Sequence, residues 1–271
     1  MIDDGSLVLS DRDLEDLRQA KAFLVSPSLT ARLGELIGGP IERGLKLLPR
    51  NWNDKVSQAT ETALFRALEF SVSTMGKGEA RRSRDWLHKA AVVTSGAVAG
   101  ALGFYSVIVE LPFSTTVMLR SIADIARSEG HDISLVENKL ACLEVFALGG
   151  GGLASDSAET GYWAIRAALA VTMREAASHI ATKGLTQRGA PPLVRLIAGI
   201  SSRFGAVVTA QAAALAIPVA GAVSGGAVNY LFINHFQDLA RAHFIIRRLE
   251  GEYGTAAVRL AYDSLKDPWT Y

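Results

Sequence analysis

The chain has 271 residues, of which 49% are hydrophobic and 20% are charged. Its 28 Lys and Arg residues balance 27 Asp and Glu residues, so there is no overall field to attract nucleic acid, and we expect no nucleic-acid partner. The single cysteine excludes an intrachain disulfide framework and indicates a reducing compartment. Residues 1–9 have neither the positive nor the apolar region of a secretory signal, so we expect a cytoplasmic protein.

The first part of the chain predicts a series of helices. Ser10, followed by acidic residues, is typical of a helix N-cap, and Ser26 and Pro27 should end this first helix. A second helix is expected over 28–37, and one or two further turns should follow before Pro49. We interpret residues 1–49 as an N-terminal helical cap and residues 50–271 as the main helical domain. The main domain should open with an amphipathic helix over 52–75.

Two long segments carry no formal charge, 90–109 and 204–237, and both contain more Ala, Val and Gly than Leu and Ile. Their length would span a bilayer as helix. Their small residues would equally let two helices approach closely in a soluble core. Basic residues and Trp86 precede the first segment, as at a membrane boundary. Polar and small residues dilute the first segment, and Pro218 would interrupt the second, so we favour a compact protein that buries both.

We expect these two apolar helices to pack centrally and to cross where side chains are absent. The predicted crossing points are Gly96, Gly100, Gly221 and Gly225. The other expected helices are 112–128, 135–148, a helix from Asp156 to 181, 193–220 with a break at Pro218, 223–251 and 255–265. Pro112 lacks an amide donor, so one helix should end there and another begin. No strand pattern or 20–50-residue repeat is present, so the fold class should be all-α.

Polar residues on the helix after Pro112 have two interpretations. Asp124 lies four residues after Arg120 and three before Arg127, so one carboxylate can lie between two guanidinium groups on one helix face. A mostly buried Arg120–Asp124 pair would fix the register of the helix against its neighbours. Alternatively, Glu110 and Arg120 face a cavity and hold the head group of an amphipathic ligand.

The polar residues of the last long helix, expected over 223–251, also have two interpretations. Asn229 lies in an apolar run and needs hydrogen-bond partners, which a neighbouring helix or a ligand could supply. His235 and Asp238 share a helix face, but one His and one carboxylate are fewer ligands than a metal site needs. We therefore expect no metal. The Gly149–Gly152 run lacks the Lys and Ser or Thr of a phosphate-binding loop, so we interpret it as a flexible turn.

Two groups of residues resemble a known family. The residues Glu110-Leu111-Pro112, Arg120, Ile122-Ala123-Asp124-Ile125-Ala126 and Gly130-His131-Asp132 are similar to the central signature of the EcsC family, and Pro218, Gly221-Ala222, Ala227, Asn229 and Phe232 are similar to its C-terminal signature. Together they cover about residues 90–248, whereas residues 1–49 show no match to the pattern. The resemblance implies a bacterial, mostly helical protein from a family named for a gene beside an ABC transporter. It implies no established activity, catalytic residue or cofactor.

We therefore expect a helical binding or accessory protein, cytoplasmic or peripheral to the bacterial inner membrane, that encloses an apolar or lipid-like ligand. Its expected partners are such a ligand, the membrane surface or a membrane transporter. The expected ligand-binding residues are Glu110, Arg120, Asp124, Asn229, His235 and Asp238, and four of them, Glu110, Arg120, Asn229 and His235, should line one cavity. The alternatives are a membrane-inserting accessory of an ABC-type transporter and an enzyme that acts on lipid.

Overall fold

The computed structural model describes residues 9–74, 104–152, 158–185, 189–217 and 223–266, and it contains no strand in these ranges. The all-α prediction is therefore confirmed. The helices are α1 (Asp11–Val25), α2 (Leu29–Ile37), α3 (Glu42–Leu45), α4 (Trp52–Thr74), α6 (Tyr105–Ser128), α7 (Val136–Leu148), the 3₁₀ turn η2 (Gly149–Gly152), α8 (Ala158–Lys183), α9 (Pro191–Ala216), α10 (Val223–Tyr253) and α11 (Thr255–Ser264).

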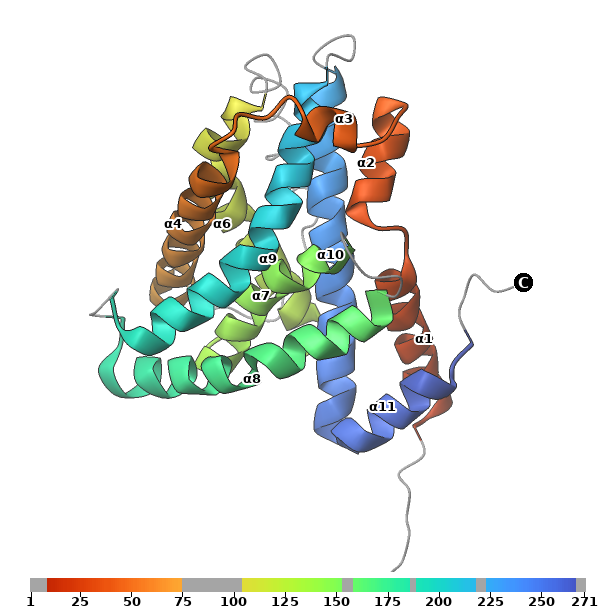
Figure 1. Cartoon of the computed structure of the whole chain (residues 1–271). Helices are drawn as coiled ribbons and strands as arrows, with labels where there is room; N and C mark the ends of the chain where they lie inside the picture. The colour runs from red at the N-terminus through yellow and green to blue at the C-terminus, as the bar shows by residue number, and fades with distance from the viewer. Residues whose placement is uncertain (1–8, 75–103, 153–157, 186–188, 218–222, 267–271) are drawn as a thin grey trace, which may run out of the picture.

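Helices α9 and α10 run through the middle of the molecule, as Figure 1 shows, and the other helices surround them. Helix α9 packs against α2, α3, α4, α6, α7 and α8, and α10 packs against α1, α2, α6, α7 and α11. The two also contact each other. Two apolar helices are therefore central, as predicted, although both contain parts of the second uncharged segment, 204–237. The buried ring cluster of Phe146, Phe204, Phe232 and Phe236 joins α7, α9 and α10.

The predicted crossing of the two uncharged segments lies mostly outside the described residues. Residues 90–103, with Gly96 and Gly100, are not described, and neither is Gly221. Gly225 is buried in α10. Among the described helices, two, α6 and α9, are long and apolar enough to cross a membrane by length and composition alone. The most apolar stretches of these helices are 50% and 56% buried, so both contribute to the packed core of the described fold.

The predicted helix boundaries agree closely with the structure where local capping decides them. The Ser10 and Ser28 side chains accept hydrogen bonds from the backbone of Asp13 and Ala31 and so begin α1 and α2. The prediction at Pro112 was wrong, because α6 continues through it. Buried residues on both sides, Leu111 and Thr115, pack α6 into the core, and this packing outweighs the missing hydrogen bond of one proline.

Two glycines allow close contacts that a side chain would prevent. A Cβ on Gly44 in α3 would lie 2.0 Å from the carbonyl oxygen of Ala213 in α9. A Cβ on Gly149 would lie 2.5 Å from the ring of Phe236 in α10. The glycine run that begins at Gly149 forms a 3₁₀ turn against α9 and α10. Its first glycine therefore serves a close packing contact, which the interpretation as a flexible turn did not include.

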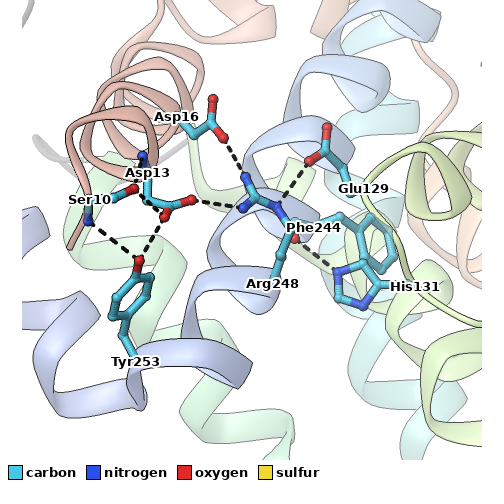
Figure 2. A network of polar contacts seen from close by, with 8 residues as sticks. All are labelled: Ser10, Asp13, Asp16, Glu129, His131, Phe244, Arg248 and Tyr253. Atoms are coloured by element: carbon cyan, nitrogen blue, oxygen red, sulfur yellow. Dashed lines mark hydrogen bonds and ion pairs between the residues drawn. The ribbon is translucent and has the colours of Figure 1, made fainter. Parts of the chain in front are cut away.

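Helix α1 is joined to α10 by a polar network, shown in Figure 2. Arg248 donates hydrogen bonds to the carboxylates of Asp13 and Asp16, and its Nε lies 3.6 Å from an oxygen of Glu129. The Tyr253 hydroxyl donates to Asp13 at 2.7 Å, and the Ser10 and Tyr253 hydrogen bonds hold the pKa of Asp13 below its usual value. This network attaches the predicted N-terminal cap to the core.

Candidate functional site

A groove of about 800 Å³ lies between α7, α8 and α10 and reaches the start of α11 at Thr255. Its volume is within the range of roughly 300–1,000 Å³ that is typical of small-molecule sites. Apolar residues form much of its wall, notably Leu140, Trp163 and Met173. Charged residues from all three long helices also line it, namely Glu137, Glu144, Arg166, Arg174, Arg247 and Glu250.

Small side chains form part of the α8 wall, beside the larger Arg166, Met173 and Arg174. Ala167, Ala170, Ala177 and Ala181 line the groove, and their spacing of three, four or seven residues places them on one face of the helix. Trp163 lies one turn before them on the same face. A methyl group occupies much less space than a Leu side chain, so these alanine positions place little side-chain volume in the groove.

Glu144 is the most buried charged residue of the groove. It lies in α7 among apolar neighbours, and only 4% of its surface is exposed. Neither of its oxygens forms a hydrogen bond with another residue of the described ranges. Burial raises the pKa of Glu144 to about 7, and the nearby guanidinium groups of Arg166 and Arg247 partly oppose this rise. Near neutral pH the side chain therefore exists in both protonated and ionised forms.

Behind Glu144 lies a fully buried histidine, His243 of α10. Its Nε2 is 3.5 Å from a Glu144 oxygen, and its Nδ1 is 3.3 Å from the Tyr162 hydroxyl. Burial lowers the pKa of His243 well below its usual value, so the ring is neutral at physiological pH. A neutral imidazole carries one N–H, and either tautomer can be accommodated between Tyr162 and Glu144. His243 therefore places no positive charge beside the Glu144 carboxyl.

The polar chain continues from Tyr162 to an ion pair that bridges α8 and α10. Arg166 donates to the Tyr162 hydroxyl at 3.3 Å and to both oxygens of Glu250 at 3.0 and 2.7 Å. This two-point contact fixes the orientation of both side chains. It also satisfies the charges of Arg166 and Glu250 with each other, so neither needs a ligand.

Two other donors of the groove have no acceptor. The Nε of Arg247 and the Nε1 of Trp163 are buried atoms without a hydrogen-bond partner among the described residues. Arg174 also forms no ion pair within the described ranges. A guanidinium and an indole N–H can donate but cannot accept. A buried donor without a partner is costly, and an oxygen atom of a ligand is the kind of acceptor that each of these donors lacks.

The structure places the six residues expected to bind a ligand at several separate positions. Arg120 is exposed on α6, so the prediction that it is mostly buried was wrong. Asp124 instead accepts a hydrogen bond from Arg127 at 2.7 Å, three residues further along α6. Glu110 is partly buried near the N-terminal end of α6, and desolvation raises its pKa. The observed ion pair on this helix therefore joins Asp124 to Arg127.

The expected ligand-binding residues Asn229 and Asp238 also form hydrogen bonds with other side chains of the fold. Asn229 is buried and accepts a hydrogen bond from Gln211 of α9 at 2.7 Å, which is the helix-bridging role considered from sequence. Asp238 accepts hydrogen bonds from Asn234 and Arg241. It also approaches Arg32 of α2 at 3.8 Å, so this pair links α2 to α10.

His235 contacts the glycine turn and lines a different cavity. Its Nε2 is 3.3 Å from the carbonyl oxygen of Gly149, and burial lowers its pKa to about 4. It lines a cavity of only about 50 Å³ between α2 and α10, together with Leu29. None of the six expected ligand-binding residues lines the large groove. In the described ranges, no group of three or more His, Cys, Asp or Glu side chains is arranged to hold a metal ion.

Sequence reasoning missed the groove, although the chain contains two indications of it. Glu144 is the one charged residue in the otherwise apolar run 140–148, and His243 lies in the similarly apolar run 242–246. A titratable residue in such a run is a candidate for a functional site. That Glu144, His243 and Tyr162 meet depends on how α7, α8 and α10 pack, which local patterns do not specify.

The comparisons with known proteins give one family. The model of the EcsC protein family matches residues 11–249, which include the N-terminal helices α1, α2 and α3 that showed no match by motif. Neither the curated proteins nor the solved structures give a match to the chain. The matched region includes α7, α8 and most of α10, and it ends just before Glu250 and Thr255, which also line the groove. The chain therefore belongs to the EcsC protein family.

Proposed function

We propose that this protein binds an amphipathic, lipid-like molecule in the groove between α7, α8 and α10. The observation that carries the proposal is the combination of an apolar, small-residue wall on α8 with the unpaired donors of Arg247 and Trp163 in the same groove. The apolar wall suits a hydrocarbon chain, and the donors suit a polar head group. This arrangement supports a binding role more directly than any set of residues expected from sequence.

We place this role in the cytoplasm, at or near the inner membrane from which such a ligand would come. The family name, taken from a gene beside an ABC transporter, agrees with that location. The alternative of a membrane-inserting transporter accessory is favoured by the apolarity of α6 and α9. Insertion of α9 would require it to leave its central contacts with α3, α4, α7 and α8, so we prefer the binding role. Recovery of folded protein without detergent is the observation that separates the two.

A substitution that fills the groove tests the binding role. Ala170 is exposed and lines the groove, so Ala170→Trp should occupy the space of the hydrocarbon chain. Ala168 is also exposed on α8 but does not line the groove, so Ala168→Trp is the matched control. Titration calorimetry with dodecanoate should show binding to wild type and to Ala168→Trp, and at least about tenfold weaker binding to Ala170→Trp. Equal affinities for the two variants would contradict the groove as the binding site.

A further inference from the structure

The most unusual group in the groove is a carboxyl with no hydrogen bond. Glu144 lines the groove and is 4% exposed. The Nε2 of His243 lies 3.5 Å from one of its oxygens, and this nitrogen has no hydrogen-bond partner among the described residues. Buried polar groups are nearly always paired, so an unpaired carboxyl facing a groove indicates a partner that the protein itself does not supply.

The charge around Glu144 determines which partner fits. From α8 it is influenced by Arg166, and from α10 by Arg247, Glu250 and the neutral His243. Arg166 and Glu250 neutralise each other through their two-point contact. No charged group of α4, α6 or α9 is among those that shift the pKa of Glu144 in the described ranges. On its own helix, Glu137 also lines the groove. Arg247 thus remains as the unpaired cation near this carboxyl.

An ionised Glu144 would repel an anion at Arg247, whereas a neutral Glu144 would attract it. The ionised carboxylate only accepts hydrogen bonds, but the protonated carboxyl donates one. Burial in an apolar environment can keep a carboxylic acid neutral so that it serves as a donor to an oxyanion. The environment of Glu144, with apolar neighbours along α7 and a neutral histidine behind it, has this character.

We propose that the groove recognises an oxyanion head group, a carboxylate or a phosphate, through the guanidinium of Arg247 and the neutral carboxyl of Glu144, so that ligand and one proton bind together. This inference rests on the proposed binding function and specifies the chemistry of the ligand. The Glu144 proton forms a hydrogen bond to one oxygen of the head group, and Arg247 donates to the anion. No bond is broken, and the proton is taken from solvent when the ligand binds to the ionised form.

The direction of the pH dependence follows from this proton. The pKa of Glu144 is about 7 in the free protein, so its donor form is lost as pH rises above that value. Apparent affinity scales with the binding-competent fraction, so it should fall roughly twentyfold between about pH 6.5 and about pH 8.5. Dodecanoate is ionised throughout this range, so the change in its affinity reflects titration of the protein. Glu144→Gln keeps a donor at all pH values and should bind with little pH dependence.

The experiment measures the binding of four probes to the full chain by calorimetry at both pH values. Dodecanoate and dodecyl phosphate carry both an oxyanion and a chain, dodecanol lacks the anion, and inorganic phosphate lacks the chain. We expect wild type to bind both anionic amphiphiles at least about tenfold more tightly than dodecanol or inorganic phosphate. Arg247→Met should lose this preference for the anion and still bind dodecanol. The thermal midpoint of each variant verifies that it is folded.

Different outcomes distinguish the two proposals. If neither anionic amphiphile binds wild type at about pH 6.5, the proposed function itself fails. If both bind but wild type and Glu144→Gln show the same pH profile, the groove remains a binding site and the role of Glu144 is overturned. If inorganic phosphate binds as tightly as dodecyl phosphate, the site recognises a free oxyanion and the lipid-like source is overturned. Preference for one of the two anionic amphiphiles identifies the head group as carboxylate or phosphate and supports the inference.

Discussion

At the scale of single residues, Glu144 links the stability of this protein to its groove. A carboxyl whose folded pKa is raised to about 7 binds its proton more tightly in the folded chain than in the unfolded chain. Its contribution is therefore fully present at low pH. It is lost as pH rises from the ordinary carboxyl pKa, 4.5, to the raised value, because the unfolded chain releases its proton first. An ionised Glu144 in the unligated groove therefore lowers the stability of the fold at neutral pH.

Glu144→Gln should therefore become increasingly stable relative to wild type as pH rises. The difference in unfolding free energy between the two proteins should increase by roughly 3 kcal/mol between about pH 4.5 and about pH 7.5, and then stay constant. Denaturant unfolding at several pH values measures it. Comparison of the two proteins cancels the opposite trend of His243, whose lowered pKa favours folding at higher pH. A difference that is independent of pH would show that Glu144 has an ordinary pKa.

Gly44 and Gly205 provide a second comparison of single residues. Gly44→Ala would place a Cβ against the backbone of Ala213, so we expect a loss of about 1–3 kcal/mol of stability through overpacking. Gly205 lies inside α9, where the nearest atoms to a Cβ are 3.9 and 4.0 Å away, so Gly205→Ala should stabilise the protein by about 0.5–1 kcal/mol. Thermal unfolding of both variants tests this. Equal midpoints would contradict the close α3–α9 approach.

At the scale of elements, α1 depends on the network around Arg248 shown in Figure 2. Arg248→Met keeps the aliphatic part of the side chain but removes the hydrogen bonds to Asp13 and Asp16. We expect a loss of about 1–3 kcal/mol and faster hydrogen exchange in α1 than in α9. Arg18→Met removes an exposed pair with Glu15 on the same helix and should change stability by less than about 0.5 kcal/mol. Unchanged exchange in α1 of Arg248→Met would show that apolar packing alone holds this helix.

The elements of this fold could be predicted well from sequence because local chemistry determines their ends. Ser10 caps α1 as expected, Ser28 caps α2 at its expected start, and Gly38 ends α2 in the left-handed conformation. Pro112 is the exception, because burial of its neighbours keeps α6 continuous where a break was expected. The site was less predictable for the same reason. The partner of Asp124 depends on which side of α6 faces solvent, and the groove depends on contacts between residues far apart in the chain.

At the scale of the whole molecule, the core and the groove have different compositions for different purposes. Helix α9 is apolar on most sides and is surrounded by other helices, which explains why its composition also suits a membrane. Helix α8 contributes several alanines to the wall of the groove, together with the larger Trp163 and Met173. The molecule is thus a helical scaffold with a groove lined by apolar and charged residues, in which the Nε of Arg247 and the Nε1 of Trp163 have no hydrogen-bond partner among the described residues.

The central claim is that the groove holds an anionic amphiphile, and native mass spectrometry of protein purified without detergent tests it most directly. Wild type and Ala168→Trp should each carry one additional mass per chain, which denaturation releases as a molecule with a carboxylate or phosphate head group and a hydrocarbon chain. Ala170→Trp, folded to the same thermal midpoint, should carry none. A wild-type chain with no bound amphiphile that also fails to acquire dodecanoate would contradict the account, as would an equal load on Ala170→Trp.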